Sequence, residues 1–166
     1  MKRFALPILS ILLISIAMMQ PAEVIGQTYK SEEGKFKIKF PGAIDITEKE
    51  KEKYKTTQIT CTVNENVYFV VCTTHSAPMK KPKELAKVSL DSFVESLSGK
   101  ISTKSDWDIK GNSGYIAVIN IDKTSVIHYR VVIVGQIQYQ VVVIGKKTNY
   151  EEEVAKKFFK SFKICK

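Results

Sequence analysis

Two apolar segments that flank Gly135 constrain the fold of this chain more than any other feature. Residues 125–134 and 137–144 are rich in valine and isoleucine, and only a Gly-Gln pair separates them. Glycine at the first position of a two-residue loop favours a type II′ β-hairpin. In that register Val132 faces Tyr139, and apolar residues lie on both faces of the strand pair. Because a sheet that is apolar on both sides needs cover on both sides, we expect a layer against each face.

Two amphipathic helices are available as these layers. Pro82 suits the first position of a helix over residues 82–98. A second helix follows Asn149, which is expected to cap it, and its acidic start and lysine-rich end both favour the helix dipole. The apolar stripes comprise Ala86, Leu90, Phe93, Val94 and Leu97 in the first helix and Val154, Phe158 and Phe162 in the second. The sequence therefore predicts an α+β fold, an α/β/α sandwich around a mostly antiparallel sheet.

Period-two alternation marks the remaining strands. Phe36, Ile38 and Phe40 alternate with lysines and are followed by a Pro-Gly turn, which predicts a strand with one apolar and one charged face. Further strands are expected at residues 54–63, 67–74, 101–109 and 115–121. Residues 48–53 alternate in charge sign, and we expect an exposed loop or a turn of helix there.

Residues 1–26 have the pattern of a signal peptide. A basic start precedes an apolar run, and cleavage is expected between Gly26 and Gln27, with a cut after Ala22 as the alternative. A retained anchor helix fits less well, because the apolar run is shorter than the ~20 residues that span a bilayer. No cysteine lies near the cleavage region, so a lipid anchor is not expected. Residues 27–166 would then form a single globular domain, secreted or periplasmic, without a transmembrane span.

Basic residues outnumber acidic ones, 26 to 17, and nearly all of them are lysine. After signal cleavage Arg130 would be the only arginine. Specific recognition of nucleic acid favours the arginine fork, so this composition and the export signal argue against a nucleic-acid partner. A lysine-rich surface is instead typical of a solvated face that attracts anionic lipids or polymers in a salt-dependent way.

The cysteines are candidates for a disulfide if the chain is exported. Cys61 and Cys72 lie in two neighbouring strands, and Cys165 is next to the last residue. With a two-residue turn at Glu65 and Asn66, Cys61 lies diagonal to Cys72 on one sheet face, near the outer limit of disulfide reach. Two buried free thiols are the equal alternative.

No catalytic motif is present in the sequence. Asp106 and Asp108 share a strand face, but nothing nearby adds ligands, so neither a metal nor a cofactor is expected. His128, Arg130 and Tyr139 share one face of the central strand pair and form the candidate ligand-binding set. A lone arginine among apolar residues needs a carboxylate, a backbone carbonyl or a ligand anion as partner. The alternative is an ion pair, or an arginine stem that lies over the sheet edge.

Two stretches of the chain resemble known proteins. Residues 29–42, from Tyr29 to the Pro-Gly turn, and residues 129–163, from Tyr129-Arg130 to the Phe-Phe-Lys-Ser-Phe end, resemble small exported bacterial proteins with the PsbP/Mog1-like fold. Members of that family include photosystem assembly subunits and a nuclear transport factor. The resemblance implies architecture and a binding or assembly role, with no shared catalytic motif.

These observations together predict an exported, non-enzymatic binding or assembly module at the bacterial cell envelope. Its expected partner is another envelope protein or an anionic envelope surface. One alternative is a hydrolase-like enzyme whose site gathers Asp106, Asp108, His128 and Arg130. A second alternative is a structural envelope component that its lysines hold at an anionic surface.

Overall fold

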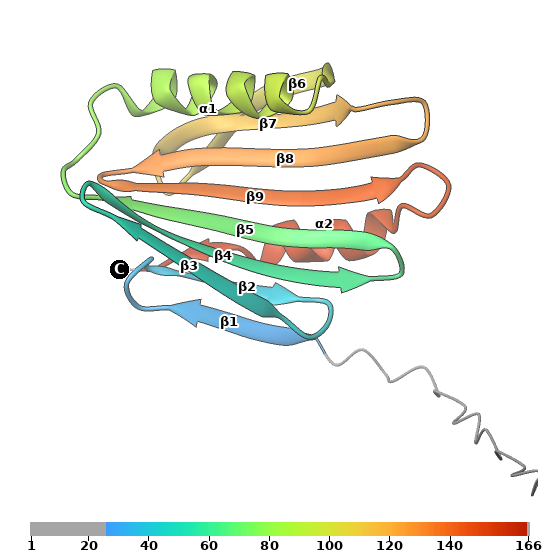
Figure 1. Ribbon diagram of the computed structural model, residues 1–166, viewed down its shortest axis with the longest axis horizontal. Helices are drawn as coiled ribbons and strands as arrows, with labels where there is room; N and C mark the ends of the chain where they lie inside the picture. Colours follow the sequence, from blue (N-terminus) through green and yellow to red (C-terminus); the bar gives the residue numbers. More distant parts are fainter. Residues whose placement is uncertain (1–25, 166) are drawn as a thin grey trace, which may run out of the picture.

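A computed structural model describes residues 26–165 of the chain (Figure 1). The predicted signal peptide therefore lies outside the described residues except for Gly26, and its cleavage stays a prediction. The first strand, β1, begins at Gln27. No helix among residues 26–165 is long and apolar enough to cross a membrane.

The centre of the molecule is a seven-stranded sheet in which every neighbouring pair is antiparallel. Its spatial order is β3-β4-β5-β9-β8-β7-β6. The strands are β3 (Asp45–Lys51), β4 (Tyr54–Val63), β5 (Asn66–His75), β6 (Lys100–Ile109), β7 (Asn112–Asn120), β8 (Ser125–Val134) and β9 (Ile137–Lys146). Long local hairpins dominate this order, since only the β5–β9 pairing joins segments distant in sequence.

The hairpin at Gly135 has the predicted register. Val132 pairs with Tyr139 and Tyr129 pairs with Val142, so β8 and β9 present apolar residues to both sides. Gly135 adopts a positive φ of 61°, a conformation that side chains with a Cβ disfavour. Both faces of the β8–β9 pair therefore need a layer packed against them.

One helix covers the first face of the sheet. α1 (Pro82–Ser96) lies over β7 and β8 (Figure 1) and buries Ala86 and Leu90 completely. Phe93 stacks on Tyr129 of β8, with ring centroids 4.6 Å apart. The predicted apolar stripe thus packs against the sheet, and α1 is part of the core.

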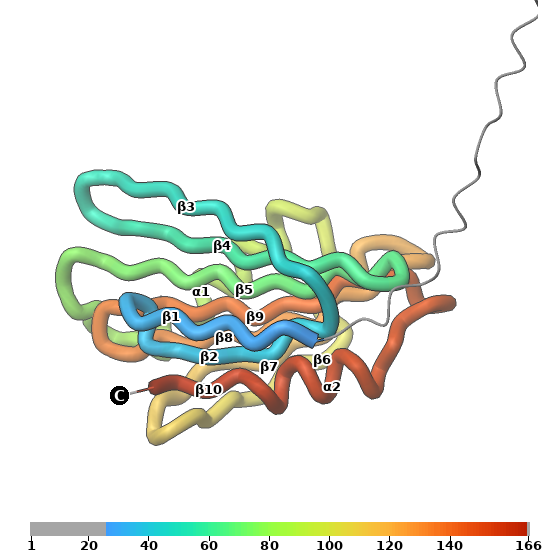
Figure 2. Tube along the Cα trace, turned by 90° about the horizontal axis from the view of Figure 1, so that it is seen from below, coloured from blue at the N-terminus to red at the C-terminus, as the bar shows by residue number. Residues whose placement is uncertain are grey.

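The opposite face carries a composite layer. α2 (Glu152–Ser161) lies beside a small sheet of β1 (Gln27–Ser31), β2 (Phe36–Phe40) and β10 (Lys163–Ile164), and Figure 2 views the molecule from below, with this layer in sight. The buried aromatic side chains of this layer meet those of the large sheet; they include Phe36, Phe40, Tyr68, Tyr139, Phe158 and Phe162. The predicted sandwich is confirmed, and the three-stranded sheet is an addition to it.

The charged stretch expected to be a loop is a strand. β3 pairs with β4 over its whole length, and every residue of β3 is exposed. Charged side chains are typical of sheet edges because they discourage pairing with another chain. The alternating charges therefore mark an edge strand.

Asn149 does not cap α2. The residue before α2 is Glu151, and no side-chain cap bond is present at that position. The Asn149 amide instead donates to Glu65 in the β4–β5 turn, and its carbonyl accepts a bond from the Asn66 side chain at 3.0 Å. Tertiary contacts at the end of the sheet have taken the place of the local cap.

The disulfide alternative is wrong, because the β4–β5 turn lies one residue earlier than expected. Asn64 and Glu65 form the turn, and both have positive φ. Cys61 consequently lies opposite Tyr68, four residues from Cys72 along the strand. That offset is about 13 Å, against a disulfide reach of about 7 Å between Cα atoms. The cysteines share one sheet face as predicted, but they are free and buried.

Candidate binding surfaces and cavities

Three lysines lie side by side across the outer surface of the small sheet. Lys37 of β2 is directly opposite Lys30 of β1 on one side and Lys163 of β10 on the other. We call this set the lysine row. Like charges at directly opposite positions destabilise a sheet. Only Lys30 among the three has an ion-pair partner within the described residues, namely Glu32.

Neighbouring lysines extend the row over the same layer. Exposed lysines of β2, α2 and β10 that make no salt bridge within residues 26–165 form what we call the lysine face: Lys37, Lys39, Lys157, Lys160 and Lys163. Lys156, by contrast, is held by Glu152 and Glu153, at 3.0 Å each. The lysine face is therefore a surface of positive charge that the fold itself leaves unneutralised.

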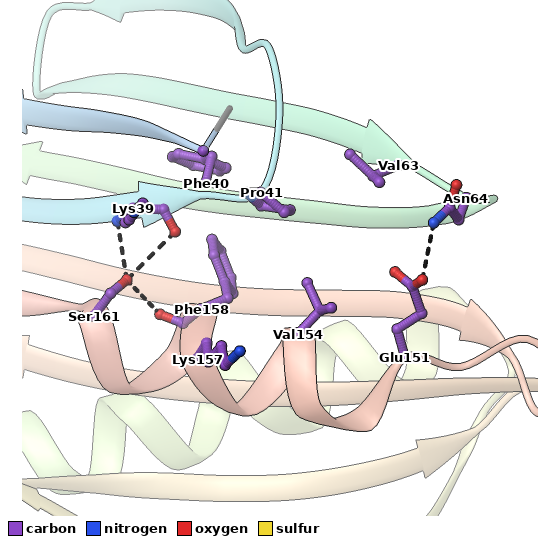
Figure 3. A pocket seen from close by; sticks show the side chains of 11 residues that line it. Lys39, Phe40, Pro41, Val63, Asn64, Glu151, Val154, Lys157, Phe158 and Ser161 are labelled. Atoms are coloured by element: carbon purple, nitrogen blue, oxygen red, sulfur yellow. Dashed lines mark hydrogen bonds between the residues drawn. The ribbon is translucent and has the colours of Figure 1, made fainter. Parts of the chain in front are cut away.

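An open groove of about 400 Å³ borders the lysine face (Figure 3). Its walls are apolar: Phe40 ends β2 and Pro41 follows it, Val63 ends β4, and Val154 and Phe158 project from α2. Lys39 and Lys157 also line it. The groove therefore combines an apolar interior with two cationic side chains and one carboxylate, that of Glu151.

Hydrogen bonds hold the two ends of the groove. At one end the Lys39 backbone N–H donates to Ser161 Oγ at 2.9 Å, and Ser161 in turn donates to the Phe158 carbonyl at 2.7 Å. At the other end Asn64 Nδ2 donates to Glu151 Oε1 at 2.9 Å (Figure 3). These bonds fix α2 against β2 and against the β4–β5 turn, so the groove is part of the folded framework.

A second cavity, of about 240 Å³, lies between β8 and α2. Two of the predicted ligand-binding residues, His128 and Arg130, line it together with Tyr150 and Phe159. The guanidinium carbon of Arg130 lies 4.3 Å from the centroid of the Phe159 ring and 5.7 Å from that of Trp107. Both distances are within the range of cation–π attraction. Within the described residues Arg130 forms no ion pair, and its side chain does not lie over a sheet edge. It packs against aromatic rings instead.

The charges around this cavity are unequal. Burial lowers the pKa of His128, with Arg130 lowering it further and Glu152 opposing both. The His128 ring stacks on Tyr150, with centroids 4.6 Å apart and planes 14° apart. Lys156 and Glu152, which also line the cavity, form an ion pair with each other. With His128 neutral, the lining carries one net positive charge, at Arg130.

Tyr139 shares the sheet face of Arg130 but does not line the cavity. Its ring is buried, and its hydroxyl donates to the Gly34 carbonyl at 2.7 Å, so it ties β9 to the β1–β2 turn. Tyr68 is buried on the same face, yet its hydroxyl has no partner among residues 26–165. The structure therefore assigns Tyr139 to the core.

The residues of the hydrolase alternative do not come together. Asp106 and Asp108 lie on the α1 side of β6, where Asp106 accepts a hydrogen bond from Lys83 at 2.8 Å and Asp108 accepts one from Ser113. His128 and Arg130 face the α2 side of the sheet. No cluster that could hold a metal ion is present within residues 26–165.

Sequence reasoning missed the aromatic residues that line the cavity with His128 and Arg130. Phe159 could have been placed from the periodicity of α2, because it lies one position from the predicted stripe. Tyr150 lies in the segment before α2 and has no signal in the sequence. The lysine row could not be predicted from the sequence, since β10 is only two residues long and has no periodic pattern.

The sequence matches no family model and no curated protein. Among solved structures, cyanobacterial PsbP from Synechocystis superposes with a TM-score of 0.61 at 8% identity, over 92% of this chain and 98% of that one. A crystal structure from Bacteroides thetaiotaomicron matches with a TM-score of 0.43 at 12% identity, over 85% of this chain and 49% of that one. The first comparison agrees with the architecture expected from residues 29–42 and 129–163, and the chain has the PsbP-like fold.

Proposed function

We propose that this protein is an exported, non-enzymatic binding module of the cell envelope, and that it holds an acidic protein partner on the lysine face and in the adjoining groove. The signal-like N-terminus supports export. The PsbP-like fold is consistent with a module whose role is binding. A fold hosts many functions, however, so the choice of surface rests on the side chains.

The lysine row carries the proposal. Lys37 between Lys30 and Lys163 costs the folded protein stability, because the ammonium group of Lys163 repels that of Lys37, and Lys30 adds a weaker repulsion that its partner Glu32 reduces. A partner that brings carboxylates to this surface removes the repulsion. A binding surface can keep such a cost, because activity and stability make different demands on the same residues.

The groove favours a protein partner over a bare charged surface. Its apolar walls match an apolar side chain, and Lys39 and Lys157 suit acidic residues on either side of it. A partner segment with one apolar residue flanked by aspartate or glutamate fits both features. Association steered by such charges weakens as salt screens them.

Photo-crosslinking in the native envelope tests this function. A photoreactive amino acid at Asn64, at the end of the groove, should give one discrete protein adduct. The same amino acid at Lys123, in the exposed β7–β8 turn, should give none. Equal adducts at both positions, or none at Asn64, would contradict the assignment of the groove.

A matched pair of double variants tests the charge. Lys37→Gln with Lys157→Gln should abolish the Asn64 adduct. Lys100→Gln with Lys123→Gln removes the same charge from lysines that make no salt bridge among residues 26–165, and should preserve the adduct. Binding to anionic lipid vesicles without any protein adduct would instead favour the structural component held at a charged surface.

Export is tested separately by the mass of the protein recovered outside the cytoplasm. A start at Gln27 is expected. An intact residue 1 would contradict export by a cleaved signal, and a start at Glu23 would move the cleavage to Ala22.

A further inference from the structure

We propose that the cavity between β8 and α2 binds a small organic monocarboxylate, with Arg130 as the group that receives its carboxylate. This site is separate from the groove, and it does not depend on the function proposed above. It is built from β7, β8, the segment before α2, and α2 itself.

Arg130 has unused hydrogen-bonding capacity. Within residues 26–165 it makes no salt bridge and no side-chain hydrogen bond, although it is partly buried. A guanidinium removed from water needs such partners, because unpaired polar groups are costly to bury. The carboxylate that also lines the cavity, Glu152, is engaged by Lys156 at 3.0 Å.

Aromatic contacts prepare Arg130 for an anion. Phe159 at 4.3 Å and Trp107 at 5.7 Å lie within cation–π range of the guanidinium. Contacts of this kind restrain the guanidinium without using its N–H groups as hydrogen-bond donors. Two of these N–H groups can match the two oxygens of a carboxylate.

The charge of the lining selects a monoanion. Among the lining residues Arg130 is positive, the charges of Lys156 and Glu152 cancel, and His128 is kept neutral by burial and by the adjacent arginine. Glu153, which lies outside the lining, is the second partner of Lys156. One net positive charge balances a carboxylate. A phosphate dianion would add a second negative charge close to Glu152.

The size and polarity of the cavity define the rest of the ligand. Ile116, Ala155 and Phe159 supply apolar walls. The volume of about 240 Å³ is below the ~300–1,000 Å³ of pockets for drug-sized molecules. A short alkyl or aryl carboxylate therefore fits better than a long-chain acid or a nucleotide.

Trp107 offers a built-in reporter for the test. It is the only tryptophan of the chain and it contacts Arg130, so a ligand that engages the guanidinium should change its fluorescence. The purified protein is titrated with butyrate, with the uncharged butyramide and with inorganic phosphate, and saturation-transfer NMR of the ligand serves as a second readout.

Butyrate should bind saturably, while butyramide should not and phosphate should bind more weakly. Arg130→Gln should raise the dissociation constant for butyrate about tenfold or more, and Arg130→Lys should lie between, since lysine keeps the charge without the fork. Lys83→Gln, on the α1 side of the sheet, is the matched control and should leave binding unchanged.

Three results would overturn the proposal: no saturable binding of butyrate by either readout, equal binding of butyramide, or tighter binding of phosphate. A folded Arg130→Gln variant with unchanged affinity would also do so. If that variant fails to fold, Lys156→Gln decides. It leaves Glu152 unpaired at the cavity and should weaken butyrate binding, so an unchanged affinity would refute the site.

Discussion

Replacing Lys37 by glutamate should stabilise the protein. Lys37 is the middle member of the lysine row, opposite both Lys30 and Lys163. Lys37→Glu changes two like-charge contacts into two opposite-charge contacts. A gain in stability would show that repulsion at the centre of the lysine row works against folding.

The expected gain follows from the register. Directly opposite charge pairs contribute roughly 0.2–1 kcal/mol each relative to alanine, and like pairs oppose folding. Two such contacts give a gain of about 1 kcal/mol in the free energy of unfolding. For a domain of this size, that free energy raises the melting temperature by about 3 °C.

The assay compares the melting temperatures of two variants, Lys37→Glu and the control Lys39→Glu. Lys39→Glu introduces the same change of charge on the same strand. The cross-strand neighbour of Lys39 is Thr28, so little gain in melting temperature is expected. The difference between the variants should shrink in high salt, which screens exposed charges. Equal melting temperatures, or a loss of stability in Lys37→Glu alone, would refute the repulsion in the lysine row.

Three further predictions concern the interior. Tyr139→Phe should lower the free energy of unfolding by about 1–3 kcal/mol, because it leaves the buried Gly34 carbonyl unpaired. Tyr68→Phe should leave that free energy nearly unchanged, because the Tyr68 hydroxyl has no partner among residues 26–165. Equal losses for the two variants in chemical denaturation would contradict this. In the native protein a thiol reagent should modify Cys165 alone, because Cys61 and Cys72 are buried and burial raises the pKa of both thiols. In denaturant the reagent should modify all three cysteines. A protein mass lower by two hydrogens, with two cysteines unmodified in denaturant, would reveal a disulfide instead. Since burial lowers the pKa of His128, the unfolded state binds more protons, so stability should fall as pH drops from about 7 through the unfolded value near 6.5. His128→Gln should reduce that slope, and an unchanged slope would contradict a buried neutral ring.

The features predicted correctly from the sequence are those that local chemistry determines. The glycine turn at Gly135 sets the register of β8 and β9, and the periodic apolar residues of α2 show which side of the helix is buried. Both signals act over a few residues. The structure that each signal predicts therefore does not depend on contacts with distant segments.

The features that were missed depend on tertiary contacts. The β4–β5 turn differs by one residue because Asn64 accepts the left-handed conformation, and this moves Cys61 away from Cys72. The two-residue strand β10 exists only because β2 offers it an edge. The rings beside Arg130 come from β6 and α2, which only the complete fold brings together.

Zero-length crosslinking in the native envelope tests the proposed binding surface most directly. A carbodiimide joins lysine amines to carboxylates in contact with them, and mass spectrometry identifies the linked lysines. Intermolecular links should be concentrated at Lys37, Lys39 and Lys157. Links spread evenly over the exposed lysines, including Lys100 and Lys123, or links absent from the lysine face, would contradict an acidic protein partner at this surface.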